Sequence, residues 1–268
     1  MKDDLSALEN MVYSGRGIII GVTPSGNTFI GYFLTGRSHS SRARKLVQQQ
    51  KTKIIRTEIT DKQQLKQDDL ALLLYPAIIP IRNILIAGNG AQTQLLYSKI
   101  KNSIDKMTDN IFSLSEIMKK AFSEPFFVYD EKNDKMIDLT NYEPDPPNNT
   151  PRITAAVCGW HGTMHITRCE DTRKNSETHE VILGPGKGNL ITTYKGDNKE
   201  PLKPFMGKPL DVTINSETAD NLAKNIYSAI CSRKKQGNDY AIGVAVMLQN
   251  KKTNSLETKI INKIDKGK

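Results

Sequence analysis

Several short segments of the chain combine residue types that could bind an anion or move protons. The densest is residues 36–44, GRSHSSRAR, which directly follows an expected strand. Guanidinium groups present planar forks of donors that match phosphate oxygens, and serine hydroxyls add short donors. The segment therefore predicts a phosphate or oxyanion site. A solvated basic loop and a contact to a nucleic-acid backbone are the alternatives.

Two further segments could complete such a site. Residues 89–93, NGAQT, lie between an expected strand and an expected helix, where Gly90 allows close backbone approach and free N–H groups can face an anion. The same Asn-Gly pair also forms ordinary turns. Residues 142–152 hold the carboxylates Glu143 and Asp145 in a proline-rich loop. A rigidly held carboxylate could act as a general base, although composition alone favours a surface acidic loop.

The remaining reactive side chains carry less information. Residues 184–188, GPGKG, lack the GK[ST] ending and the following helix of a phosphate-binding P-loop, so we expect a hairpin loop there. The three cysteines, Cys158, Cys169 and Cys231, form no CxxC motif, and the four histidines have no metal-binding spacing. We therefore predict no metal site, and an odd number of thiols argues against a disulfide framework.

The hydrophobic pattern predicts the elements that position these segments. Apolar and β-branched runs predict strands over residues 16–22, 28–34, 53–59, 70–74, 84–87, 153–157, 164–169, 180–183, 190–194, 240–248 and 256–261. Apolar residues at three- and four-residue spacing predict helices over residues 93–104, 114–122 and 216–232, the last with Ser216 as its N-cap. Residues 141–151 are expected to form a turn-rich loop. Because strands and helices do not alternate strictly, this order favours an α+β protein with largely antiparallel sheets over a doubly wound fold.

Composition limits the class of protein. The chain has 268 residues, 37% of them hydrophobic and 25% charged, which are ordinary globular values that exclude chain-wide disorder. The longest mostly apolar stretch, residues 71–81, is too short to span a bilayer, and the charged N-terminus contains no signal peptide, so we expect a cytoplasmic protein without a membrane partner. No linker or repeat divides residues 1–268, which predicts a single domain. The net charge of +9 favours an anionic partner.

Taken together, the motifs resemble those of the archaeal-type IMP cyclohydrolases and their bacterial relatives. The order and spacing of the motifs carry the resemblance, since each motif alone is short. They are YSGRG at 13–17, GRS at 36–38 with SR at 41–42, Tyr75, NG at 89–90 with Thr93, NTPRI at 149–153 and TYKGD at 193–197.

The resemblance implies both a fold and a reaction. The implied fold is a four-layer αββα sandwich similar to the N-terminal nucleophile hydrolases, without the self-processing nucleophile of that superfamily. The implied reaction closes the ring of 5-formamido-imidazole-4-carboxamide ribonucleotide and releases water, giving inosine monophosphate in the last step of purine synthesis. It requires no cofactor and no metal. The resemblance also implies a homo-oligomer, since members of this family tend to form them.

The resemblance assigns candidate site residues as well. The family's suspected catalytic arginine, tyrosine and glutamate fall on Arg42, Tyr75 and Glu143. Ring closure needs an acceptor for the carboxamide proton, donors for the formyl oxygen and a proton source for the departing hydroxyl. We assign the first role to Glu143 and the second to Arg42, while Tyr75 would orient the substrate or relay a proton. The candidate substrate contacts are Arg37, Ser38, Asn89, Gly90, Thr93, Asn149, Thr150 and Arg152.

The chain also departs from the family pattern. Gln94 replaces a frequent Asp, Asn189 replaces a His of near relatives, and His39 and Ser40 replace acidic and amide residues. Two alternatives therefore stay open. One is a catalytically diverged relative that binds a purine-type nucleotide. The other is a basic nucleic-acid-binding protein. The 6% aromatic content argues against it, as does the lack of a helix-turn-helix signal, of zinc ligands and of an RRM-like aromatic pattern.

Overall fold

A computed structural model describes residues 2–61, 73–106, 113–130, 134–231 and 239–266. The first of its two large sheets is antiparallel and six-stranded, in the order β13-β12-β1-β2-β14-β15. Its centre is the hairpin of β1 (Arg16–Val22) and β2 (Thr28–Thr35), both of which the sequence predicted as strands. The other strands are β12 (Lys187–Thr192), β13 (Leu210–Thr213), β14 (Ala241–Gln249) and β15 (Leu256–Asn262).

The second large sheet is antiparallel and seven-stranded, in the order β11-β10-β9-β6-β5-β4-β3. Its strands are β3 (Arg44–Gln48), β4 (Ile55–Ile59), β5 (Pro76–Ile81), β6 (Ile84–Gly88), β9 (Arg152–Cys158), β10 (His161–Glu170) and β11 (Arg173–Ile182). A separate two-stranded sheet pairs β7 (Phe127–Asp130) with β8 (Lys135–Asp138). The predicted α+β class with antiparallel sheets is confirmed.

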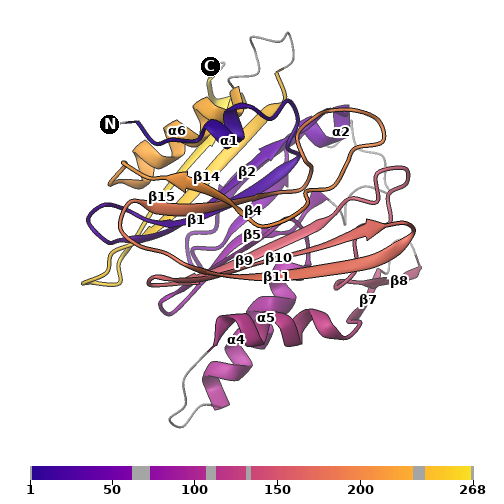
Figure 1. Ribbon diagram of the computed structural model, residues 1–268, viewed down its shortest axis with the longest axis horizontal. Helices are drawn as coiled ribbons and strands as arrows, with labels where there is room; N and C mark the ends of the chain where they lie inside the picture. The colour runs from indigo at the N-terminus through magenta and orange to yellow at the C-terminus, as the bar shows by residue number, and fades with distance from the viewer. Residues whose placement is uncertain (1, 62–72, 107–112, 131–133, 232–238, 267–268) are drawn as a thin grey trace.

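The two large sheets face each other through a shared apolar cluster, which includes Ile18 and Tyr32 from the first sheet and Ala155 and Met164 from the second. The outer face of the six-stranded sheet is covered by α1 (Ser6–Glu9) and α6 (Ala219–Cys231), and that of the seven-stranded sheet by α4 (Gln92–Lys106) and α5 (Leu114–Ser123) (Figure 1). Two short helices, α2 (His39–Arg42) and the 3-10 helix η4 (Lys263–Lys266), complete the described elements.

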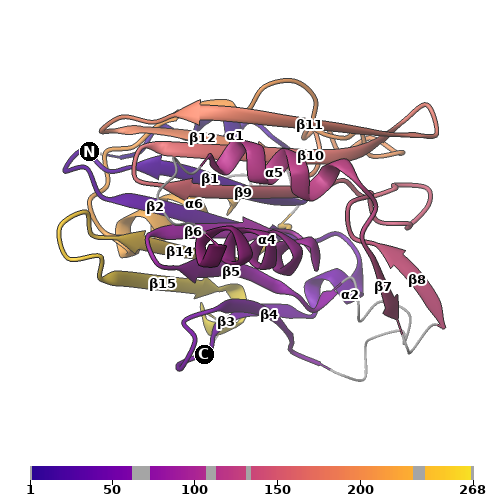
Figure 2. The same cartoon turned by 90° about the horizontal axis from the view of Figure 1, so that it is seen from below.

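The helices adhere to the sheets through the apolar faces that their spacing predicted. Leu222, Ile226 and Ile230 of α6 are buried against the six-stranded sheet. Burying one such side chain contributes roughly 1.5–3 kcal/mol. Figure 2 shows α4 and α5 lying across the seven-stranded sheet. No helix in the described part of the chain is long and apolar enough to cross a membrane.

One predicted strand is misplaced. Of residues 70–74, 70–72 lie outside the described residues, and Leu73 and Leu74 are not in a strand; the strand is β5, which starts at Pro76. Proline lacks the N–H that a residue donates in a sheet, so Pro76 and Pro80 argued against a strand over the residues that form β5. β4 pairs with β5 only at Ile55–Ile78 and Arg56–Pro76, so Pro80 lies beyond the end of that pairing.

The predicted N-cap of the last helix is also wrong. α6 begins at Ala219, and the hydroxyl of Thr218 accepts a hydrogen bond from the N–H of Asn221 at 3.2 Å. The hydroxyl of Ser216 instead donates to the carboxylate of Asp3 at 3.0 Å. Long-range contact with the N-terminal segment therefore decides the role of Ser216.

Several strands were not predicted, or were predicted too short. β3, β7, β8 and β13 have no predicted counterpart, and β11 extends well before the expected residues 180–183. β11 is an edge strand whose sequence, RKNSETHEVI, is almost entirely polar. Hydrophobic alternation cannot reveal a strand that has little apolar surface to bury.

Candidate functional site

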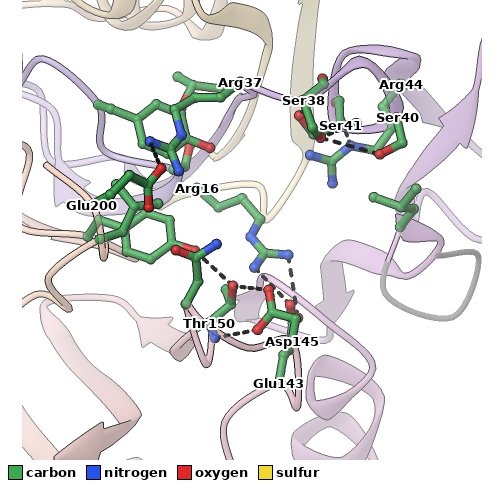
Figure 3. Close-up of a pocket in the computed structure, with 17 residues that line it drawn as sticks. Arg16, Arg37, Ser38, Ser40, Ser41, Arg44, Glu143, Asp145, Thr150 and Glu200 are labelled. Atoms are coloured by element: carbon green, nitrogen blue, oxygen red, sulfur yellow. Dashed lines mark hydrogen bonds and ion pairs between the residues drawn. The ribbon is translucent and has the colours of Figure 1, made fainter. Parts of the chain in front are cut away.

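A cavity of about 540 Å³ brings together two of the three segments predicted to form a site, residues 36–44 and 142–152. Its walls come from the start of β1, the α2 region, the loop after β8 and the loops after β12. Figure 3 shows Arg16 reaching between the carboxylates of the loop and the serine and arginine side chains around α2. The site is thus assembled from segments that lie far apart in the sequence.

The α2 wall is rich in hydroxyl groups. Ser38 caps α2 by accepting a hydrogen bond from the N–H of Ser41 at 3.1 Å. The Ser41 hydroxyl donates to the backbone oxygen of Ser38, and the hydroxyls of Ser38 and Ser40 lie 3.3 Å apart. All three serines line the cavity. A short helix with a serine cap therefore holds three hydroxyl groups beside one another.

Arg44 is a buried cation at this wall. The residue is 5% exposed, its Nε donates to the backbone oxygen of Ser41 at 2.9 Å, and its Nη1 is buried without a hydrogen-bond partner. Within the described ranges no carboxylate forms an ion pair with it. A buried charge without a counterion is unfavourable, so this guanidinium is suited to an anion that enters the cavity.

Arg37 lies at the rim of the same wall. Its guanidinium stacks 4.9 Å above the ring of Tyr13, and its Nη1 contacts Asn198 at 3.2 Å and the carboxylate of Glu200 at 2.7 Å. The Glu200 side chain is 62% exposed. Solvent screens such a pair, so Arg37 can exchange this partner for a ligand at little cost.

The opposite wall holds Glu143 between two buried arginines. Arg16 approaches both carboxylate oxygens, at 3.1 and 3.4 Å, and Arg152 lies 3.7 Å from one of them. Burial opposes the charge of Arg16, but the Glu143 carboxylate together with the nearby tyrosines outweighs that effect and holds the pKa of Arg16 well above its ordinary value. The carboxylate is therefore fixed in position by two cations.

The loop that carries Glu143 is closed by its own hydrogen bonds. The Asp145 carboxylate accepts from the N–H of Thr150 at 2.6 Å and from its hydroxyl at 2.5 Å, and the Thr150 hydroxyl lies 2.8 Å from the hydroxyl of Tyr194. Burial raises the pKa of Asp145 against the opposing hydrogen bonds from Thr150. Burial also raises the pKa of Tyr194, so this phenol stays protonated near neutral pH.

Two glycines are required by close approach at the site. Gly15 has a φ of +70°, and a Cβ there would lie 2.7 Å from the ring of Tyr194. A Cβ on Gly90 would lie 2.5 Å from Nη1 of Arg152. Both positions therefore exclude a larger side chain from the packing behind the cavity.

The predicted residues fall into two groups. Arg37, Ser38, Glu143 and Thr150 line the cavity. The others do not line it: Arg42, Tyr75, Asn89, Gly90, Thr93, Asn149 and Arg152. Asn148 lines the cavity in place of Asn149.

The two predicted catalytic residues outside the lining differ in exposure. Arg42 is exposed, with its Nε donating to the backbone oxygen of Gly36 at 3.2 Å and its guanidinium 5.9 Å from the ring of Tyr240. Tyr75 is buried, and its hydroxyl lies 2.7 Å from that of Tyr32. Tyr75 also faces the charge of Arg16. Its position is therefore behind the cavity rather than in it.

The NG motif supports the carboxylate wall from behind. The Asn89 amide donates to the backbone oxygen of Pro151 at 2.8 Å and accepts from the N–H of Ile153 at 2.9 Å. Gln92 donates from Nε2 to Oδ1 of Asn89 at 2.8 Å, and its Oε1 accepts from Nη1 of Arg152 at 3.1 Å. The Thr93 hydroxyl donates to the backbone oxygen of Gly90 at 2.8 Å. These side chains tie the end of β6 to the loop that enters β9.

Sequence reasoning assigned no site role to many of the lining residues. Five of them lie within the predicted 36–44 and 142–152 segments: Ser40, Ser41, Arg44, Asp145 and Asn148. The others lie outside those segments: Tyr13, Gly15, Arg16, Thr35, Leu73, Tyr194, Glu200 and Leu202. Arg16 and Tyr194 lie within the YSGRG and TYKGD motifs, which was the signal available for them. In the described part of the chain no group of three His, Cys, Asp or Glu side chains is arranged to hold a metal ion.

Comparison with known proteins places the chain beside one family. A family model described as IMP cyclohydrolase-like protein matches residues 13–116. The chain is 21% identical over 213 residues to the IMP cyclohydrolase of Methanococcus maripaludis strain C6, covering 80% of this chain and 86% of that protein. The protein of strain C7 is 22% identical with the same coverage. The chain is thus related to the IMP cyclohydrolase-like proteins, and the predicted resemblance is confirmed.

A solved structure also overlaps much of the chain. The Anbu (Gly-1) mutant from Hyphomicrobium sp. strain MC1 covers 92% of this chain and 88% of its own, at 9% identity and a TM-score of 0.35. A score this low carries no argument about fold or function.

Proposed function

We propose that the cavity binds 5-formamido-imidazole-4-carboxamide ribonucleotide and closes its ring to inosine monophosphate with loss of water. The observation that carries this proposal is the buried Arg44 guanidinium, which lacks a carboxylate partner within the described ranges and lies beside three serine hydroxyls. A nucleotide 5′-phosphate supplies the missing negative charge and accepts from all of these donors. The volume of about 540 Å³ lies in the range of small-molecule sites, which favours a mononucleotide over a nucleic acid.

The heterocycle then lies against the carboxylate wall. The carboxamide nitrogen is a weak nucleophile, so its attack on the formyl carbon needs a proton acceptor. Glu143, which lines the cavity and is held by Arg16, takes that role. Arg16 lies beside the same carboxylate and donates toward the oxygen that becomes negative. Holding the two reacting groups together supplies much of the acceleration, because the reaction is intramolecular.

The family-derived assignments outside the cavity lining belong to the same proposal. Arg42 binds or polarises the formyl oxygen if α2 shifts toward the nucleotide, and Tyr75 orients the substrate through Arg16. Asn89, Gly90, Thr93, Asn149 and Arg152 contribute by shaping the wall behind the substrate. The proposal also includes a single domain over residues 1–268, a four-layer αββα sandwich similar to the N-terminal nucleophile hydrolases, a cytoplasmic location and a homo-oligomer.

The alternative is a relative that binds a purine mononucleotide without catalysing ring closure. The departures at His39, Ser40, Gln94 and Asn189 favour it. Ser40 lines the cavity, whereas Asn189 pairs with Asp211 on the exposed edge of the six-stranded sheet at 3.0 Å. Of these departures, Ser40 therefore bears most directly on the ligand.

One experiment separates the two functions. The purified protein is mixed with the formamido-imidazole ribonucleotide, and inosine monophosphate is followed by chromatography against a no-enzyme control. Saturable formation of inosine monophosphate that is lost in Arg44→Met supports the cyclohydrolase function. Arg42→Ala is measured in parallel. Binding of inosine monophosphate without formation of product supports the binding protein, and the absence of both overturns the proposal.

A further inference from the structure

We propose that Asp145 is the proton donor for the departing hydroxyl in the ring closure and that Thr150 positions it. This inference rests on the proposed function and adds a catalytic residue to it. Asp145 lines the same cavity as Glu143 but has no ion pair in the described part of the chain. The two carboxyl groups of one loop therefore have different surroundings and can serve different steps.

The geometry of Asp145 is fixed by a single neighbour. One carboxylate oxygen accepts the backbone N–H of Thr150 at 2.6 Å, and the other lies 2.5 Å from the Thr150 hydroxyl. The Tyr194 hydroxyl, 2.8 Å from that of Thr150, holds the threonine side chain in turn. Each carboxyl oxygen keeps a second lone pair, so a proton can be held toward the cavity while Thr150 maintains the orientation.

The charged groups around Asp145 come from several elements. Glu143 lies on the same loop, Arg16 on β1, Arg152 at the start of β9 and Tyr194 after β12. Burial and the Glu143 carboxylate favour the neutral acid, while Thr150 and Arg16 favour the anion, and the pKa of Asp145 is raised from its ordinary value. Glu143 is held by two guanidinium groups, whereas Asp145 has no ion pair in the described part of the chain, so the two carboxyl groups are assigned different steps.

The proposed step balances without a further reactant. The attack transfers a carboxamide proton to Glu143, which passes it to the former formyl oxygen. The former formyl carbon then carries a hydroxyl group, the new ring nitrogen and the formamido nitrogen. The carbon–oxygen bond breaks with its electron pair on oxygen, and that oxygen takes the Asp145 proton and leaves as water. The lone pair of the formamido nitrogen forms the carbon–nitrogen double bond. The proton which that nitrogen loses restores Asp145, so the acid is regenerated at each turnover.

The test is Asp145→Asn in the full chain, compared with wild type from pH 4 to 9. Asparagine keeps an acceptor for the Thr150 N–H but cannot deliver a proton. We expect turnover to fall about 100-fold or more, with the affinity for inosine monophosphate changed less than threefold by calorimetry. Wild-type turnover should fall as pH rises through the raised pKa of Asp145, because the acid must be protonated. That alkaline limb should be absent in Asp145→Asn. Asp211→Asn, the same change on the exposed strand β13, is the matched control and should leave turnover unchanged.

Thr150→Val supplies an independent readout that a structural role alone would not give. Valine keeps the backbone N–H and the approximate volume but removes the hydroxyl that favours the Asp145 anion. The alkaline limb should therefore move to higher pH. The inference would be overturned if Asp145→Asn turned over as fast as wild type, or if the alkaline limb of the pH profile stayed at the same pH in Thr150→Val. Either result would leave the proposed function standing. A wild-type protein that forms no product would overturn both.

Discussion

The two walls of the cavity differ in how their charged side chains are paired. Glu143 and Asp145, in the loop of residues 143–150, both have donors within the protein, from Arg16 on β1 and from Thr150. On the α2 wall, Nη1 of the buried Arg44 has no hydrogen-bond partner. The carboxylates of the first wall are therefore paired without a ligand, whereas the buried cation of the second wall is suited to an anionic ligand.

This difference suits the carboxylate wall to catalysis and the α2 wall to binding an anion. A carboxylate fixed by two guanidinium groups needs no rearrangement when charge moves during a reaction. A buried cation without a counterion destabilises the protein and favours the binding of an anion. Mutations in the two walls should therefore affect stability and binding in different proportions.

The largest effect is expected from Glu143→Gln. The change leaves Arg16 and Arg152 buried without their shared counterion, which should lower the free energy of unfolding by about 3 kcal/mol. Turnover should fall by ~10²-fold or more because the proton acceptor is lost. Urea unfolding followed by circular dichroism and the rate of inosine monophosphate formation measure the two effects. Glu58→Gln, a change at a half-exposed side chain of β4, should alter neither. An equally stable and active Glu143→Gln protein would remove Glu143 from both roles.

Arg44→Met should separate binding from stability. The variant removes the charge but keeps an apolar stem, so the free energy of unfolding of the empty protein should stay within about 1 kcal/mol of wild type. The affinity for inosine monophosphate should weaken ~10- to 100-fold, since charged hydrogen bonds to the phosphate are lost. Calorimetry and urea unfolding test both parts. A loss of stability as large as that of Glu143→Gln would contradict the unpaired state of Arg44.

The smallest effect is expected at the rim. Glu200→Gln removes the exposed partner of Arg37 and frees its guanidinium for the nucleotide. We expect the affinity for inosine monophosphate to rise about two- to fivefold at low salt, with little change in the free energy of unfolding. The gain should shrink at 0.5 M salt, because exposed charges are screened. A weaker affinity would show that Glu200 itself contacts the ligand.

The sequence predicted the framework of the fold well where apolar patterns were strong. The β1–β2 hairpin, β6, β14 and the apolar faces of α4, α5 and α6 all follow from hydrophobic spacing. The polar edge strand β11 and strand β5 did not, because β11 has little apolar surface and the two prolines of β5 argue against a strand. Their positions depend on neighbouring strands that are remote in the sequence.

The candidate site was predictable by segment but not by side chain. The motifs located the α2 region and the 143–150 loop, yet Arg44 lines the cavity beside the predicted Arg37, whereas the predicted Arg42 does not. A run of arginines and serines does not reveal which side chains turn inward, because that depends on where α2 ends and β3 begins. Arg16 could not be singled out either, since its ion pair joins residues 127 positions apart.

The hydrogen bonds of Asn89 have a consequence for how such proteins evolve. Its amide fastens two backbone segments, so its loss would damage the architecture before any chemistry was affected. Selection for folding alone would retain this asparagine in a descendant that had abandoned the ancestral reaction. The NG motif therefore records shared ancestry more faithfully than shared activity, and the cavity-lining side chains are where lineages with different substrates would diverge.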